Sequence, residues 1–203
     1  MLTTQLPGFK DPVHDAQQTF RALLDALARP GIQQTNTSLT PPEGLNPGCA
    51  AACLTLLDLE TTVWLQPDVA ESARSWLVFH TGCRFTAQPQ TADFAVINNV
   101  ETMPNLEDFN WGTAAYPEAS TSLLIQLPAL EGTGSVTLQG PGILESITLQ
   151  MPLGSDFWQQ WQAMTAHYPL GLDAWCFADR QVLGLPRTAR VAGRQEGGSE
   201  SAD

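Results

Sequence analysis

Three side chains with complementary chemistry could form a site for a small molecule. His80 could act as an acid or a base near neutral pH, and Arg187 could hold an anionic group. Glu118 could complete one pocket with them. Two of these residues also have a purely structural interpretation, because His80 can pack at the end of a helix and Glu118 can lie in a turn. The sequence therefore leaves open a stand-alone enzyme built on His80, Glu118 and Arg187.

Arginine is concentrated near the end of the sequence. Four of the nine lysines and arginines lie in positions 180–203, namely Arg180, Arg187, Arg190 and Arg194. The guanidinium group suits recognition of a carboxylate or phosphate through two parallel hydrogen bonds. The cluster indicates either a solvated basic edge on an acidic protein or a docking site. As candidate binding residues for a partner or an anion we take His80, Glu118, Arg187 and Thr188.

Cysteine and histidine spacing raises the question of a metal site. Cys49 and Cys53 are four positions apart and would share a helix face, and His80 and Cys83 are three apart. Three sulfurs and one imidazole form a set that zinc accepts tetrahedrally. Cysteine on an apolar helix face, however, packs as a small hydrophobe. We favour core packing and expect no metal, while a metal-stabilised scaffold remains an alternative.

Motifs for nucleophilic and phosphate-binding sites are absent from the sequence. It has no Gly-x-Ser-x-Gly nucleophile turn and no phosphate-binding loop that ends in Gly-Lys-Ser/Thr. A pyridoxal phosphate enzyme needs a lysine to hold its cofactor, and the one lysine, Lys10, precedes the first predicted helix. We therefore expect no cofactor and name no catalytic residue.

Composition and charge restrict the class of partner. The formal net charge is −12, so phosphate backbones repel the chain and nucleic-acid binding is not expected. Charged residues make up only 15% of the chain, and six tryptophans are present, which favours contact with partner proteins or with a second copy. No apolar run of about 18 residues and no signal-peptide core occurs. We therefore expect a cytoplasmic protein without membrane contact, with its four cysteines reduced.

The elements that would position these residues alternate between helix and strand. Helical spacing covers 14–29, 47–57, 68–82 and 155–168, and a short helix is expected within 104–109. Strands are expected at 61–65, 93–97, 122–127 and 135–138, with a hairpin formed by 174–177 and 182–185. Some strands follow each other directly, which predicts an α/β fold with a mixed sheet flanked by helices. We divide the chain into an extended lead-in (1–12), a single α/β domain (13–192) and a polar, disordered tail (193–203).

Several short stretches, taken in order, resemble PhnH, the family of H subunits of bacterial carbon–phosphorus lyase. The resemblance covers roughly residues 13–191. It rests on Phe20-Arg21-Ala22-Leu23-Leu24, Leu54-Thr55-Leu56, Phe79-His80-Thr81, Gly112-Thr113-Ala114, Pro117-Glu118-Ala119, Gly140-Pro141-Gly142-Ile143, Tyr168-Pro169-Leu170-Gly171-Leu172-Asp173 and Leu185-Pro186-Arg187-Thr188.

The resemblance implies a role in organophosphonate catabolism. Such subunits assemble with G, I and J subunits, and with G, I and L they support transfer of phosphonate to the ribose of ATP with loss of adenine, before the C–P bond is cleaved. It also implies a fold like that of pyridoxal-phosphate transferases without the cofactor site. The family supplies no catalytic residue to carry over, so no independent catalysis is expected.

Overall fold

The computed structural model describes residues 6–192. This part contains four α-helices: α1 (Pro12–Ala28), α2 (Pro47–Leu56), α3 (Glu71–Thr81) and α4 (Ser155–Thr165). The strands are β1 (Gln34–Thr35), β2 (Thr62–Leu65), β3 (Arg84–Thr86), β4 (Phe94–Ile97), β5 (Ser122–Gln126), β6 (Gly134–Gln139), β7 (Ile147–Met151), β8 (Asp173–Ala178), β9 (Gln181–Leu185) and β10 (Arg190–Val191). Four short 3₁₀ turns complete it: η1 (Pro89–Thr91), η2 (Val100–Thr102), η3 (Leu106–Asp108) and η4 (Pro117–Ala119). The expected α/β class with a mixed sheet is confirmed.

A seven-stranded sheet forms the centre, in the order β1-β9-β8-β5-β4-β2-β3. The strands from β8 to β3 run parallel, whereas β9 and β1 add an antiparallel edge. A separate antiparallel sheet has the order β10-β6-β7. The hairpin expected at 174–185 is the β8–β9 pair, in which Ala178 pairs with Gln181.

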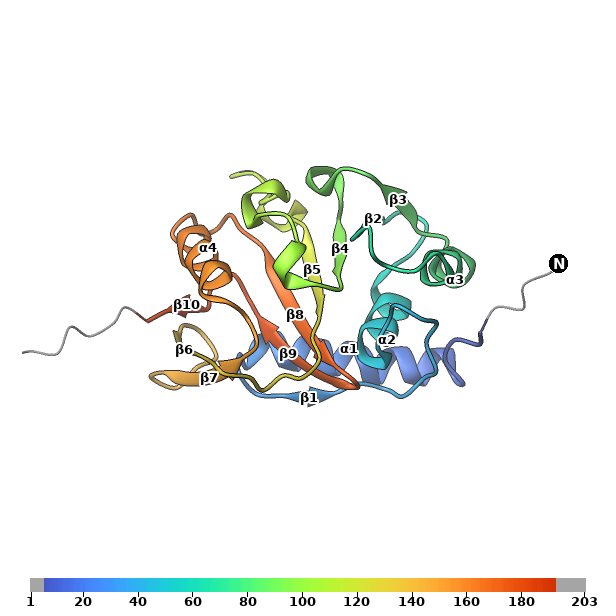
Figure 1. Cartoon of the computed structure of the whole chain (residues 1–203), viewed down its shortest axis with the longest axis horizontal. Coiled ribbons are helices and arrows are strands. Elements are labelled where there is room, and N and C mark those ends of the chain that lie inside the picture. Colours follow the sequence, from blue (N-terminus) through green and yellow to red (C-terminus); the bar gives the residue numbers. More distant parts are fainter. Residues whose placement is uncertain (1–5, 193–203) are drawn as a thin grey trace, which may run out of the picture.

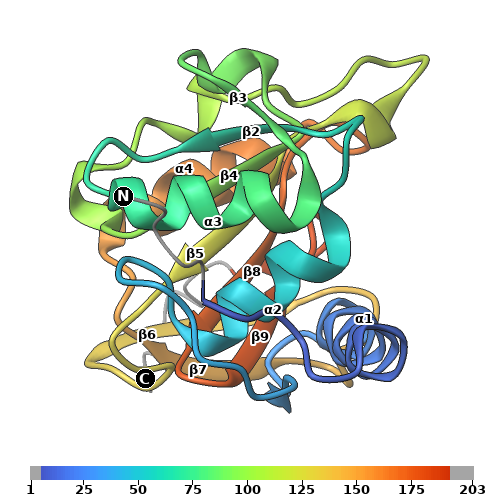
Figure 2. The same cartoon turned by 90° about the vertical axis from the view of Figure 1, so that its right-hand side faces the viewer.

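Both faces of the large sheet are buried, as parallel strands require. Along β5, Leu123 and Ile125 face one core and Leu124 faces the other. The first core includes α4 and the inner face of the small sheet, with Trp161 and Leu138 fully buried. The second lies under α1, α2 and α3, which stand in front of the sheet in Figure 2. Figure 1 shows α4 and the small sheet on the opposite side from α3.

The starts of three helices can be compared with the expected ranges. Asn46 caps α2, because its side chain accepts a hydrogen bond from Cys49 N–H and Pro47 follows at the first helical position. Pro12, the last residue of the expected lead-in, begins α1, because a proline at the first helical position loses no helical hydrogen bond. Helix α3 begins at Glu71, three residues after the expected start at 68, and Ala70 before it makes no side-chain cap.

Other observations concern α4, α1 and the short strands. Helix α4 begins at Ser155 as expected but ends at Thr165, three residues before the expected end. Helix α1 buries Leu23 and leaves Phe20 and Leu24 exposed. The strands β1, β3, β7 and β10 were not predicted. Three of them have only two or three residues, too few for a period of two to be recognised.

Two further expectations concern the termini and the membrane. Within residues 6–192, no helix combines the length and the apolar character that a membrane crossing requires. The disordered tail expected at 193–203 lies outside the described residues. The division into lead-in, domain and tail therefore stays a prediction.

Packing of α1 on β9 gives a stability test. A Cβ built on Gly184 would lie 2.4–2.6 Å from the backbone of Ala26 and Leu27, so helix and strand would have to separate. We expect Gly184→Ala to lower the free energy of unfolding by about 1–3 kcal/mol, the usual cost of overpacking. Gly154→Ala is the control, because no atom lies within 4 Å of its built Cβ. Urea unfolding followed by circular dichroism measures both variants, and equal stabilities would contradict the packing described.

Candidate functional site

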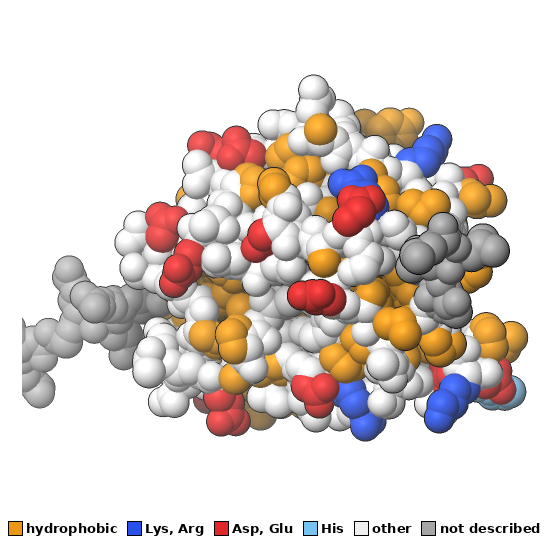
Figure 3. All heavy atoms as spheres, turned by 45° about the vertical axis from the view of Figure 1, so that its right-hand side comes forward, with side chains coloured by type: hydrophobic (Ala, Val, Ile, Leu, Met, Phe, Trp, Pro, Cys, Tyr) orange, Lys and Arg blue, Asp and Glu red, His pale blue; other side chains and the backbone are white. Residues whose placement is uncertain are grey.

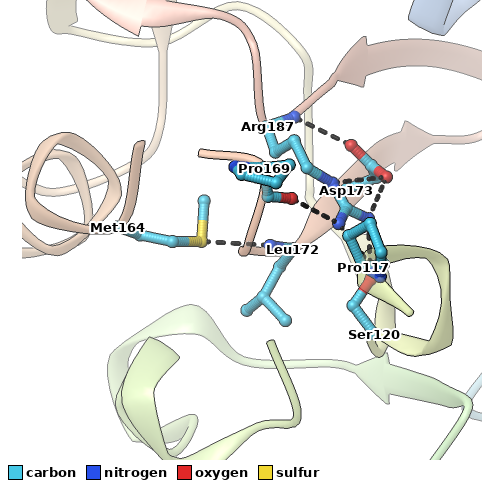
Figure 4. Close-up of polar contacts among 7 residues, drawn as sticks. All are labelled: Pro117, Ser120, Met164, Pro169, Leu172, Asp173 and Arg187. Atoms are coloured by element: carbon cyan, nitrogen blue, oxygen red, sulfur yellow. Dashed lines mark hydrogen bonds and ion pairs between the residues drawn. The ribbon is translucent and has the colours of Figure 1, made fainter. Parts of the chain in front are cut away.

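Arg187 joins three segments of the chain at the amino end of β8. Its Nη2–H donates to Asp173 Oδ2 (2.6 Å) and to Ser120 Oγ (2.6 Å), and its Nε–H donates to the same carboxylate oxygen at 3.1 Å. Its Nη1–H groups donate to the carbonyl oxygens of Pro117 (2.8 Å) and Pro169 (3.3 Å). Figure 4 shows the guanidinium enclosed by these partners. The Arg187 backbone N–H adds a bond to Asp173 Oδ1 (2.8 Å).

These contacts use the complete donor set of the guanidinium. Arginine carries five side-chain N–H groups, and the five hydrogen bonds of Arg187 match that number. Its side chain is only 13% exposed and that of Asp173 25%. In this structure the guanidinium donors of Arg187 all bond within the chain, and binding of a partner or an anion by Arg187 stays a prediction. The side chain acts as an internal clamp.

Of the other candidate binding residues, Glu118 and Thr188 adjoin residues of this clamp in the sequence, whereas His80 belongs to α3. His80, near the end of α3, donates from Nε2 to Leu6 O (3.0 Å), and Trp76 Nε1–H donates to the same oxygen (2.9 Å). Glu118 is exposed in η4, next to the carbonyl that Arg187 holds. Thr188 lines a small depression of about 450 Å³ that also contains Tyr168. His80 therefore contacts the segment before α1, whereas Arg187 contacts residues at the amino end of β8, and a shared pocket of His80, Glu118 and Arg187 stays a prediction.

The cysteines lie in the apolar interior. All four are buried, and burial raises the pKa of the Cys176 thiol to about 12. Burial, together with the neighbouring Cys53, also raises the pKa of Cys49. Within residues 6–192, no three His, Cys, Asp or Glu side chains are grouped as metal ligands. Cys49, Cys53, His80 and Cys83 are therefore not brought together as one ligand set.

A polar crevice lies at the carboxyl ends of the parallel strands. The β2–β3 connection, α3, covers one face of the sheet, whereas the β4–β5 connection places Leu106 and Phe109 in the opposite core. In open α/β sheets, ligands bind at the carboxyl ends of two strands whose connections lie on opposite faces of the sheet. The crevice there has a volume of about 780 Å³, and its lining includes Asn46, Asp68, Asn98, Asn99, Glu101 and Gln126.

A relay of amide hydrogen bonds fixes the polar side chains of this crevice. Gln126 Oε1 accepts from Asn46 N–H (2.6 Å), so its amide nitrogen is the group that donates to Gly44 O and to Asn98 Oδ1. Gln66 Oε1 accepts from the backbone N–H groups of Asn98 (2.8 Å) and Asn99 (2.9 Å). The relay therefore holds the ends of β2, β4 and β5 together.

Sequence reasoning missed these amides although a signal was present. Gln66 follows the apolar end of β2, Asn98 follows Ile97 of β4, and Gln126 ends β5. Polar residues directly after buried strands commonly line α/β ligand sites. Among residues 6–192, no lysine or arginine lines the crevice, so these residues alone are unsuited to hold an anion.

Comparison with known proteins identifies the family. The model of the family described as "Bacterial phosphonate metabolism protein (PhnH)" matches residues 7–192. The chain belongs to the PhnH family. It is 39% identical over 187 residues to the alpha-D-ribose 1-methylphosphonate 5-triphosphate synthase subunit PhnH of Rhizobium meliloti (strain 1021), covering 91% of this chain and 94% of that protein. It is 26% identical over 180 residues to the putative C-P lyase subunit protein HtxG of Stutzerimonas stutzeri, covering 86% of this chain and 85% of that protein.

The clamp predicts that a conservative substitution is costly. Arg187→Lys keeps the charge but cannot reproduce a planar set of five donors, so Asp173, Ser120 and the two carbonyl groups lose partners. We expect the free energy of unfolding to fall by about 1–3 kcal/mol. The control is Arg190→Lys, at an exposed position of β10, which should change stability by less than about 0.5 kcal/mol. Equal effects of the two substitutions would show that the clamp does not stabilise the fold.

Proposed function

We propose that this chain is a subunit of the synthase and carbon–phosphorus lyase assembly that degrades organophosphonates. The observation that carries the proposal is the 39% identity to a synthase subunit, which extends over 91% of this chain. The relative named a putative C-P lyase subunit points to the same process. In this role the chain supports catalysis by the assembly and is not expected to turn over substrate alone.

The finer assignment follows from the family resemblance. The partners are the G, I and J subunits of the lyase core, with the L protein acting in the same step. The supported reaction transfers phosphonate to the ribose of ATP with loss of adenine, and the C–P bond is cleaved later. The assembly works in the cytoplasm, and this chain contributes neither a cofactor nor a metal. The proposal also includes a fold like that of pyridoxal-phosphate transferases, without their cofactor lysine.

The distribution of charge supports a dependent role. The net charge of −12 opposes anionic substrates, and the least exposed arginine contact, at Arg187, serves the chain itself. Lys10 lies exposed just before α1. A basic partner could reverse the field locally, because charges within about 8–10 Å interact despite physiological salt. The assembly could thus handle a phosphate-rich substrate that this chain alone would repel.

Growth and reconstitution test this role together. Cells that lack this chain should not grow on an alkylphosphonate as sole phosphorus source, and they should grow normally on inorganic phosphate, which is the control. The purified chain should show no activity on ATP and phosphonate. The other subunits should convert these substrates only when this chain is added. Full turnover without the chain would remove the proposed role, and turnover by the chain alone would establish the stand-alone enzyme.

We further propose that the isolated chain forms a homodimer through exposed apolar surface. Val13, Phe20 and Leu24 lie exposed along one flank of α1, and Phe79 is exposed on α3. On the face shown in Figure 3, hydrophobic side chains gather in the right-hand half. Covering such patches favours association.

Light scattering on the purified chain at micromolar concentration should give twice the monomer mass of 22.0 kDa. Phe20→Glu should weaken the dimer if the α1 flank forms the contact, because a charge would then be buried without a partner. A strict monomer for the unmodified chain would contradict self-association.

A further inference from the structure

Two asparagines at the carboxyl end of β4 bring unused hydrogen-bond donors to the polar crevice. Asn98 and Asn99 both line the crevice and are half-buried. Asn98 Oδ1 accepts from Gln126 Nε2–H, and Asn99 Oδ1 accepts from Glu101 N–H (2.9 Å). Among residues 6–192, the side-chain nitrogen Nδ2 of either asparagine has no hydrogen-bond partner. Each asparagine therefore has an NH₂ group available to a ligand.

Backbone N–H groups, which can only donate, dictate the orientation of these amides. Asn46 N–H donates to Gln126 Oε1 (2.6 Å), so Gln126 presents its NH₂ group to Asn98 and must meet the oxygen of that side chain. Glu101 N–H fixes the oxygen of Asn99 in the same way. Exchanging nitrogen and oxygen in either asparagine would set donor against donor. The two NH₂ groups are therefore the parts of these side chains that remain unpaired.

Two carboxylates at the same crevice complement these donors. Asp68 and Glu101 line it, and within the described part of the chain neither carboxylate forms an ion pair or accepts a hydrogen bond. An anion would be repelled by both charges, and a cation would leave both NH₂ groups without an acceptor. A neutral molecule that carries hydroxyl or amine donors together with oxygen or nitrogen acceptors satisfies both sets.

The start of α2, which also lies at the crevice, leaves no N–H group free for a phosphate. Phosphates bind helix starts through the first backbone N–H groups. Here Pro47 has no N–H, Gly48 N–H donates to Asp179 O (2.7 Å), and Cys49 N–H donates to Asn46 Oδ1 (2.8 Å). The phosphate groups of a ligand in this crevice would therefore have to be bound by another protein.

The rest of the lining suits a flat ring with polar edges. Val100, Leu127, Pro128 and Pro152 add apolar surface beside the amides and carboxylates. The volume of about 780 Å³ lies within the range of small-molecule sites. Open α/β sheets bind nucleotides at this position, at the carboxyl ends of strands whose connections lie on opposite faces. A nucleoside combines apolar ring faces with the donors and acceptors that this lining requires.

We propose that the crevice binds the uncharged nucleoside end of ATP, while the triphosphate extends to basic groups of a partner subunit. The exocyclic amine and the ribose hydroxyls donate to Asp68 and Glu101. Asn98 and Asn99 donate to ring nitrogens or hydroxyl oxygens. The inference rests on the proposed function, because that function supplies ATP as the substrate.

Nuclear magnetic resonance titrations of the full chain with adenosine and ATP test the site. Adenosine should shift the side-chain NH₂ resonances of Asn98 and Asn99, which are assigned by their loss in Asn98→Asp and Asn99→Asp. At low salt ATP should bind about tenfold more weakly than adenosine, because the net charge of −12 repels the triphosphate, and about 0.5 M salt should reduce the difference. Resonances that adenosine leaves unshifted, or ATP binding as tightly as adenosine at low salt, would overturn the inference.

The separate halves of adenosine locate the recognised groups. Adenine and ribose should each bind more weakly than adenosine, because each meets only part of the lining. If either half binds as tightly as adenosine, the other half is not held and the assignment to a nucleoside fails. Deleting residues 193–203 should leave the adenosine affinity unchanged, and a tighter affinity after the deletion would also overturn the inference, because the tail would then be the occupant.

A matched pair of variants isolates the free donor. Asn98→Asp keeps an oxygen that accepts from Gln126 but replaces the NH₂ group by a second oxygen, so we expect adenosine to bind about tenfold more weakly. Gln17→Glu adds the same charge at an exposed position of α1 and should stay within about twofold of the unmodified chain. Equal weakening by the two variants would show that added charge alone is responsible, which would overturn the inference.

Reconstitution with the other subunits separates this inference from the proposed function. An assembly that contains Asn98→Asp should have a KM for ATP raised about tenfold, whereas Gln17→Glu should leave it unchanged. An unchanged KM with Asn98→Asp, in an assembly whose turnover requires the unmodified chain, would overturn the inference and leave the proposed function intact. Turnover that does not require the unmodified chain would overturn both.

Discussion

The five hydrogen bonds of the Arg187 guanidinium fix how the chain passes between its two sheets. Arg187 lies between β9, in the large sheet, and β10, in the small one, and its ion pair with Asp173 anchors that passage to the start of β8. Two residues later, Ala189 O accepts the Nε1–H of Trp161 (2.9 Å), which attaches the same turn to α4. The position of β10 therefore depends on a side chain held by Asp173, Ser120 and two backbone carbonyl groups.

This use of arginine has consequences for function. An acidic chain that uses its least exposed ion-paired arginine internally has little positive charge left for an anionic substrate. The crevice at the carboxyl ends of β2, β4 and β5 carries amides and carboxylates, and within the described part of the chain no lysine or arginine lines it. Surfaces of this kind suit a subunit whose partners supply the phosphate-binding charge. The chain would then contribute shape and polar hydrogen-bonding groups.

The elements with strong local signals were predictable from the sequence. The apolar runs at β4 and β5 predict these strands to within a few residues of their observed bounds. The Asn46-Pro47 pair predicts the start of α2, and the turn between β8 and β9 predicts their hairpin. The two-residue strands β1 and β10 exist only because β9 and β6 pair with them, so no local pattern could reveal them. The role of Arg187 could not be predicted, because its partner Asp173 lies 14 positions away and no local sequence pattern links the two residues. The amides of the crevice carried a usable signal, because each follows a buried strand.

Hydrogen exchange of the full chain, alone and bound to the rest of the lyase core, shows directly whether the Arg187 clamp is complete within this chain. If it is complete, the amides of Leu185, Arg187 and Ala189 exchange slowly in both states. Binding of partners then slows exchange in segments away from the clamp. Rapid exchange of these three amides in the free chain, slowed only in the complex, would contradict a complete clamp, because Arg187 would then await a partner to complete its hydrogen bonds.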